Sequence, residues 1–83
     1  MGYIVKEEDM QIGEVTRRGP FVTEQEARMA LGNLVEQAYD FNPQLATANV
    51  RQEVEDAVRD GRKDCFDAKG NLVCLSRVEG EES

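Results

Sequence analysis

The chain has 83 residues without histidine or tryptophan, and its 17 acidic residues outnumber 10 basic ones for a formal net charge of −7. The absence of histidine removes the usual general acid–base group and a common metal ligand, and the acidic balance disfavours nucleic acid as a partner. No apolar run approaches the ~20 residues of a membrane span. We therefore expect one small cytoplasmic domain with no enzymatic activity, no cofactor, no metal and no membrane contact.

Residues 3–15 predict a β-hairpin. Residues 3–5 are apolar and open as a strand, residues 7–9 are acidic and suit an exposed turn, and Met10 and Ile12 alternate with a polar residue. After Gly13 the apolar phase shifts to Val15, as a glycine β-bulge would shift it. The sequence thus predicts two antiparallel strands with a turn at 7–9 and a bulge at Gly13.

A first helix is predicted from Thr23 to the residues before Pro43. Thr23 is an N-cap residue and Glu26 stands three residues later, which is the spacing of a capping box. Gly32 lies at the edge of the apolar face, where it predicts a close approach of another backbone. The apolar face consists of Ala27, Ala30, Leu31, Leu34, Val35, Ala38 and Phe41.

A second helix is predicted between Pro43 and Gly61. It begins either at Pro43 or at an N-cap Thr47, and Leu45 favours the later start because it falls off the apolar stripe. Gly61 is a natural residue to end the helix in the left-handed conformation. The stripe consists of Ala46, Val50, Val54, Ala57 and Val58.

A second hairpin follows around a turn that Asp67 opens and Gly70 closes in the left-handed conformation. This turn predicts four cross-strand pairs, which are Asp67 with Asn71, Phe66 with Leu72, Cys65 with Val73, and Asp64 with Cys74. The two cysteines then lie on opposite faces of the sheet, as buried free thiols. A two-residue turn at 69–70 would instead place them opposite each other, but lysine is a poor first residue for such a turn.

Together these elements predict an α+β fold of order β-β-α-α-β-β, with an antiparallel four-stranded sheet and two helices packed on one face. Residues 72–75 are apolar on both faces and suit a central strand. We expect residues 1–78 to form the single domain and residues 79–83 to form a flexible acidic tail.

The sharpest candidate site is an acidic flank of the second helix. Glu53, Asp56 and Asp60 follow one another at spacings of three and four, and Glu53 has no basic residue three or four positions away. Such a flank suits a basic partner surface, with mimicry of nucleic acid as one way of acting on it, or it serves solubility alone. Helical acids recur only every ~5 Å, against one charge per ~1.7 Å of duplex DNA, so mimicry needs additional acids. Met29 and Tyr39 are the candidate apolar anchors of the same contact.

Two other classes of function remain open. Arg51, Arg59, Arg62 and Lys63 form the candidate flank of a regulator that touches nucleic acid. Cys65 is the candidate nucleophile of a thiol enzyme, although no histidine is available to activate it. The interpretation that fits most observations is a non-enzymatic protein-binding domain, an inhibitor or adaptor, for which a homodimer is also open.

Overall fold

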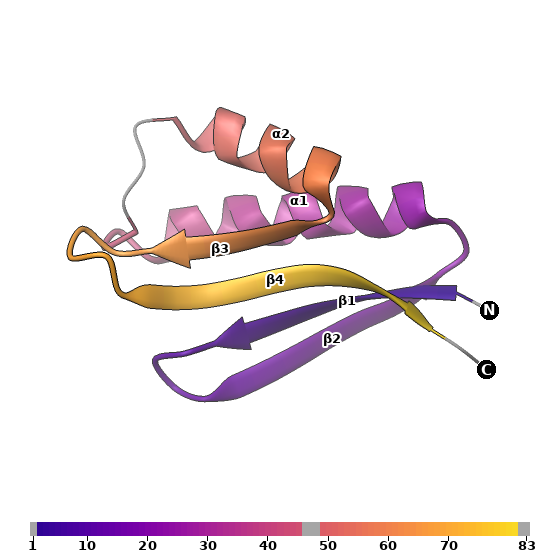
Figure 1. The fold of residues 1–83 in the computed structure, drawn as a ribbon, viewed down its shortest axis with the longest axis horizontal. Coiled ribbons are helices and arrows are strands. Elements are labelled where there is room, and N and C mark those ends of the chain that lie inside the picture. Colours follow the sequence, from indigo (N-terminus) through magenta and orange to yellow (C-terminus); the bar gives the residue numbers. More distant parts are fainter. Residues whose placement is uncertain (1, 46–48, 82–83) are drawn as a thin grey trace.

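The computed structural model describes residues 2–45 and 49–81. The elements, in chain order, are β1 (Gly2–Asp9), β2 (Glu14–Phe21), α1 (Glu24–Phe41), α2 (Val50–Asp60), β3 (Arg62–Phe66) and β4 (Leu72–Glu81). The four strands form one antiparallel sheet in the order β2-β1-β4-β3 (Figure 1). The predicted order of elements and the α+β class are confirmed.

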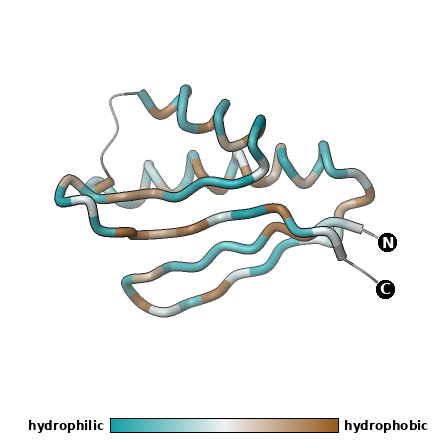
Figure 2. Tube along the Cα trace, viewed as in Figure 1, coloured by the Kyte–Doolittle hydropathy of each residue, from teal (hydrophilic) through white to brown (hydrophobic). Residues whose placement is uncertain are grey.

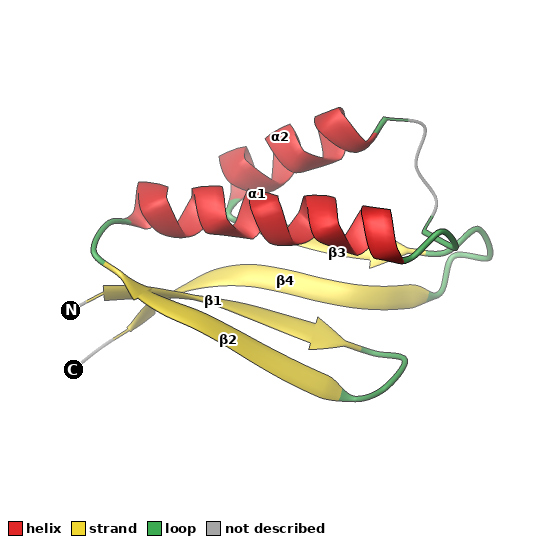
Figure 3. Ribbon diagram, turned by 180° about the vertical axis from the view of Figure 1, so that it is seen from behind, coloured by secondary structure: helices red, strands yellow, loops and turns green. Residues whose placement is uncertain are grey.

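Both helices lie on the same side of the sheet, as Figure 3 shows from behind. Helix α1 covers β1 and β4, and α2 packs against α1 and β3. Val5 of β1 and Leu31 and Val35 of α1 are among the fully buried side chains between these layers. The core therefore lies between the helices and one face of the sheet.

The first helix begins and ends where the sequence predicts. The Thr23 hydroxyl accepts a hydrogen bond from the Glu26 amide at 3.1 Å. At the other end, the Ala38 carbonyl accepts from both the backbone amide and the side-chain amide of the cap residue Asn42, at 3.0 and 2.8 Å. Helix α2 does approach closely at Gly32, but through side chains rather than backbone: an added Cβ would lie 2.7 Å from Cγ2 of Val58.

The second helix begins later than expected. Its N-cap is Asn49, whose side chain accepts a hydrogen bond from the Gln52 amide at 3.2 Å. Thr47 and Ala46, the predicted cap and the first residue of the predicted stripe, lie outside the described residues. The helix ends at Gly61 in the left-handed conformation, as predicted, with its amide donating to Ala57 at 2.8 Å.

The first hairpin corrects two expectations. Residues 7–9 are not a turn, because β1 continues to Asp9 with backbone pairing to β2 on one side and β4 on the other. Pairing on both edges holds this acidic stretch in a strand although its sequence lacks apolar alternation. Gly13 lies in the turn itself, where its amide donates to Asp9 at 2.8 Å. The bulge falls instead at residues 19–20, between the Tyr3–Phe21 and Val5–Arg18 pairs.

The second hairpin has the predicted turn but a different register beyond it. Asp67 bonds back to Asn71, and Phe66 lies opposite Leu72, as expected. A β-bulge at Val73 then inserts one residue into β4, so Cys65 lies opposite Cys74 rather than opposite Val73. The prediction that the thiols lie on opposite faces is therefore wrong. The prediction that they are buried and free is confirmed.

The last strand extends further along the chain than expected. Strand β4 runs to Glu81, and Glu79 and Gly80 pair with Ile4 and Tyr3 of β1. Residues 79–81, which were predicted to belong to a flexible tail, therefore lie in β4. Residues 82 and 83 lie outside the described part of the chain.

Candidate functional site

The acidic flank of α2 is compensated by bases of this chain. Glu53 forms an ion pair with Lys63 of β3, although it has no basic neighbour on its own helix. Asp56 and Asp60 share Arg59, with nitrogen–oxygen distances of 3.2 and 3.0 Å. The hydrogen bond from Arg59 lowers the pKa of Asp60. The three carboxylates thus lie on one side of α2 as predicted, but each already has a basic partner.

The two predicted apolar anchors lie in different environments. Met29 is 54% exposed on α1, beside Phe21 and Ala30. Tyr39 is half-buried and packs against both clusters of the core. Met29 is therefore available for contact at the surface, whereas much of the Tyr39 side chain packs against the core.

The structure does not assemble the predicted basic flank. Arg59 is occupied by Asp56 and Asp60, and Lys63 by Glu53. Arg62 and Lys63 are neighbours in β3, so their side chains leave the sheet on opposite faces. A continuous phosphate-binding surface from Arg51 to Lys63 is therefore not present.

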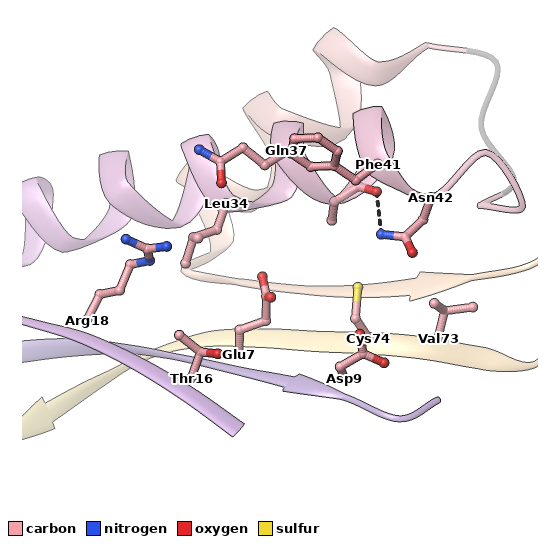
Figure 4. Close-up of a pocket in the computed structure, with 11 residues that line it drawn as sticks. Glu7, Asp9, Thr16, Arg18, Leu34, Gln37, Phe41, Asn42, Val73 and Cys74 are labelled. Atoms are coloured by element: carbon pink, nitrogen blue, oxygen red, sulfur yellow. Dashed lines mark hydrogen bonds between the residues drawn. The ribbon is translucent and has the colours of Figure 1, made fainter. Parts of the chain in front are cut away.

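A small cleft lies between α1 and the β1–β2 hairpin, and Figure 4 shows the residues that line it. Glu7 and Arg18 point into it from the sheet, while Leu34 and Gln37 face them from α1. Burial raises the pKa of Glu7, and the charge of Arg18 partly opposes this shift. The cleft has a volume of about 170 Å³, which is below the ~300 Å³ of ordinary ligand pockets.

The two thiols lie next to this cleft but inside the protein. Cys65 is fully buried and Cys74 nearly so. Their hydrogen bond lowers the pKa of Cys65 and raises that of Cys74, which burial raises further. A catalytic thiolate needs access to a substrate, and the burial of Cys65 denies it that access.

The helices leave one face of the sheet uncovered. Glu7, Thr16, Arg18 and Cys74 point toward α1 in Figure 4, so the alternate residues of their strands point the other way. Of the residues that alternation places along this open face, Gly2 is buried, whereas Phe66 and ten others are not. The ten others are Ile4, Lys6, Glu8, Val15, Arg17, Arg62, Asp64, Leu75, Arg77 and Glu79.

A row of four basic residues crosses this open face, one from each strand. Arg17 lies opposite Lys6, Lys6 opposite Arg77, and Arg77 opposite Arg62. We call these four residues the basic row. It holds four of the chain's ten basic residues, in a protein where acids dominate.

Exposed apolar residues also lie toward one end of the sheet. Val15 lies one step along the strands from the basic row, and Phe66 and Leu72 form a cross-strand pair further on. Met10 and Ile12 lie in the adjoining β1–β2 turn, and Figure 2 shows hydrophobic colour at this turn and at the start of β4. We call the five the apolar end; each is at least 37% exposed.

Comparisons with protein-family models, with curated proteins and with solved structures give no match. Within residues 2–45 and 49–81, no three or more potential ligand side chains gather in a way that would hold a metal ion. No helix in the same residues is long and apolar enough to cross a membrane.

Proposed function

We propose that this chain is a small, non-enzymatic protein-binding domain, an inhibitor or adaptor, and that the open face of the sheet is its contact surface. The observation that carries this proposal is the gathering of exposed apolar side chains at the apolar end. Five of the eight large hydrophobic residues that the described part of the chain exposes belong to it. Single exposed apolar residues are ordinary, but several toward one end of a sheet favour an interaction site there.

The architecture supports the same surface. A sheet with helices on one side alone keeps its second face available, and here that face spans all four strands. It combines apolar residues at one end with charged residues in the middle, so it offers a partner both apolar contact and charge pairing. The helical layer offers less, because its acidic flank is largely neutralised by Arg59 and Lys63.

The acidic flank of α2 stays a candidate for a second contact with a basic partner. Its support is the solvent exposure of Asp60, whose side chain is 51% accessible despite its ion pair. Exposed pairs of this kind contribute only ~0–1 kcal/mol, so a basic partner can replace Arg59 at little cost. Nucleic acid as partner has weaker support, since Arg59, Arg62 and Lys63 do not form one surface.

The proposal is tested by capturing the partner with the parent chain and then repeating the binding with purified proteins. The variant Val15→Ser/Phe66→Ser removes two apolar side chains from the open face. We expect it to weaken the purified complex by roughly two orders of magnitude, since interface aromatics contribute ~2 kcal/mol or more.

Val22→Ser/Phe41→Ser is the matched control, because both residues are 80% exposed but lie on neither the basic row nor the apolar end. It should bind as the parent does. Urea unfolding of both variants establishes that each is folded under the binding conditions. Equal weakening by the two variants, or none by the first, would contradict the assignment of the contact to the open face.

A further inference from the structure

We propose that the partner bound at the open face presents a row of carboxylates beside apolar side chains, and that the basic row receives these carboxylates. This inference rests on the proposed function and adds the chemistry of the partner to it. It assigns recognition to Arg17, Lys6, Arg77 and Arg62, of which the sequence singles out Arg62 alone, and for a different partner.

The basic row is unfavourable for folding by itself. Like charges directly opposite each other on neighbouring strands are destabilising, and this row contains three such pairs in succession. The chain has 17 acidic residues, yet none in the described part of the chain stands directly opposite a member of the row. Anionic groups of a partner would relieve this repulsion. The row is therefore better explained by binding than by stability of the fold.

Two of the four cations are unoccupied. Lys6 lies 3.1 Å from Glu8, and Arg62 lies 3.6 Å from Asp64, so both have an acid on their own strand. Within the described residues, Arg17 and Arg77 form no ion pair. Both guanidinium groups are thus free for bidentate contacts with carboxylates, which arginine makes well.

The spacing of the cations in the row matches the spacing of carboxylates along one face of a helix. Adjacent strands lie about 4.8 Å apart, so four cations span about 14 Å across the sheet. Carboxylates at positions i, i+4 and i+7 of a helix are about 5–6 Å apart, close to the same spacing. Apolar residues on the neighbouring flank of such a helix would meet Val15 and Leu75, which lie one step along the strands from the row.

The surroundings of the row favour a protein over a nucleic acid. The next residues along the strands include Glu8 and Asp64, which repel a continuous phosphate backbone as soon as it leaves the row. Single-stranded nucleic acid also relies on aromatic platforms, and Phe66 is the aromatic residue near this face. A short carboxylate row with apolar neighbours matches the surface better.

A second copy of this chain does not fit face to face. Two open faces in register would bring one basic row against the other at the ~10 Å separation of packed sheets. The helical layer, with eight acidic and three basic residues in α1 and α2, is complementary in charge. Such head-to-tail packing would build rings or open-ended chains rather than a two-fold dimer.

The test uses a helical peptide with glutamates at i, i+4 and i+7 and leucines on one adjacent flank, titrated into the ¹⁵N-labelled protein. We expect amide shifts at Lys6, Arg17, Arg62 and Arg77. A peptide with glutamine in place of glutamate should bind roughly tenfold more weakly or less well still. The variant Arg17→Gln/Arg77→Gln should show the same loss toward the glutamate peptide.

Arg51→Gln is the matched control, because Arg51 is an exposed arginine of α2 on the opposite side of the molecule. It should leave the titration unchanged. The proposal is overturned if the glutamate and glutamine peptides bind alike, if millimolar glutamate peptide shifts nothing, or if an oligothymidylate of similar length binds this face more tightly. Concentration-dependent self-association that Arg17→Gln/Arg77→Gln abolishes would overturn it in favour of a second copy.

The outcomes separate this inference from the proposed function. Loss of the captured partner with Val15→Ser/Phe66→Ser but not with Arg17→Gln/Arg77→Gln leaves a protein-binding face whose partner is not acidic. Loss with neither variant removes the open face as the contact surface altogether.

Discussion

Cys65 and Cys74 lie directly opposite each other on β3 and β4, and both side chains are buried without a disulfide between them. The bulge at Val73 creates this relationship, because one extra residue in β4 brings Cys74 into register with Cys65. Tyr39 of α1 packs against the buried cluster that holds both thiols, and burial raises the pKa of Tyr39. Helix α1 and the β3–β4 hairpin therefore pack together around the two thiols.

We predict that both thiols of the folded protein react slowly with iodoacetamide near neutral pH. Cys65 has no exposed surface, so alkylation has to await an opening of the structure, even though its pKa is lowered by the hydrogen bond from Cys74. Mass spectrometry of quenched time points measures the rate. Labelling should accelerate steeply with urea. Rapid labelling of Cys65 in the absence of denaturant would revive the thiol-enzyme hypothesis.

Local signals in the sequence were sufficient to predict the helices and their order in the fold. The Thr23–Glu26 spacing marks the start of α1, and Gly61 marks the end of α2, because capping depends on residues close in the chain. The turn at Asp67 followed from the same local chemistry. The start of α2 was missed because Asn49 competes with Thr47 as an equally good cap residue.

The predictions were wrong where pairing with a strand distant in the sequence determines the local structure. The acidic residues 7–9 are in a strand because β4, more than 60 positions later, pairs with them. Cys65 lies opposite Cys74 because of a bulge at Val73, and no residue near Val73 is of a type that indicates a bulge. Register has a period of two, so a single inserted residue exchanges the faces of the sheet.

The contrast between local spacing and long-range pairing also explains which parts of the candidate site the sequence predicts. The acids of α2 were predicted as one flank because helical spacing is local, but the tertiary ion pair of Glu53 with Lys63 was not. The basic row is invisible in the sequence because its members come from four strands, and only the complete register aligns Arg17 with Arg62.

We predict that Gly32→Ala destabilises the protein although alanine favours helices. The substitution gains about 1 kcal/mol of helix propensity, but its Cβ would lie 2.7 Å from Cγ2 of Val58 and 3.3 Å from Cγ1 of Val54. Both are stiff β-branched residues, and overpacking of this kind costs about 1–3 kcal/mol. Urea unfolding should show a net loss of about 1 kcal/mol. A gain in stability would mean that α2 moves away from α1 without cost.

We predict that Glu7→Gln stabilises the protein at neutral pH. Burial raises the pKa of Glu7 above its ordinary value of 4.5, so the folded state holds the proton more tightly than the unfolded state does. The stability that Glu7 contributes in its protonated form is therefore complete below pH 4.5 and is lost as the pH rises through the folded pKa. The glutamine variant, which has no charge to desolvate, escapes this loss.

Unfolding of the parent and Glu7→Gln across pH 3–8 should show curves that coincide at the acidic end, below the ordinary glutamate value of 4.5, and diverge above it. Thr16→Ala is a suitable control, since Thr16 lines the same cleft without a titratable group. A parent that is more stable than Glu7→Gln at neutral pH would show that Arg18 and Ser76 outweigh the effect of burial.

We predict that Glu53→Gln lowers stability and that Asp60→Asn does not, although both lie on the acidic flank. The Glu53–Lys63 pair joins α2 to β3 with side chains only 26% and 18% exposed, so removing one charge leaves the other partly buried without its partner. We expect a loss of about 1–2 kcal/mol. Asp60 is exposed at the C-terminal end of α2, where a negative charge opposes the helix dipole.

Chemical denaturation of the two variants measures this difference directly. It also decides how the flank is tested for a basic partner, because reversal of Glu53 would weaken the fold together with the surface. The variant Asp56→Asn/Asp60→Asn removes two charges of the flank and keeps the contact between α2 and β3. If this double variant retains the captured partner while Arg17→Gln/Arg77→Gln loses it, binding resides on the sheet and not on the helix.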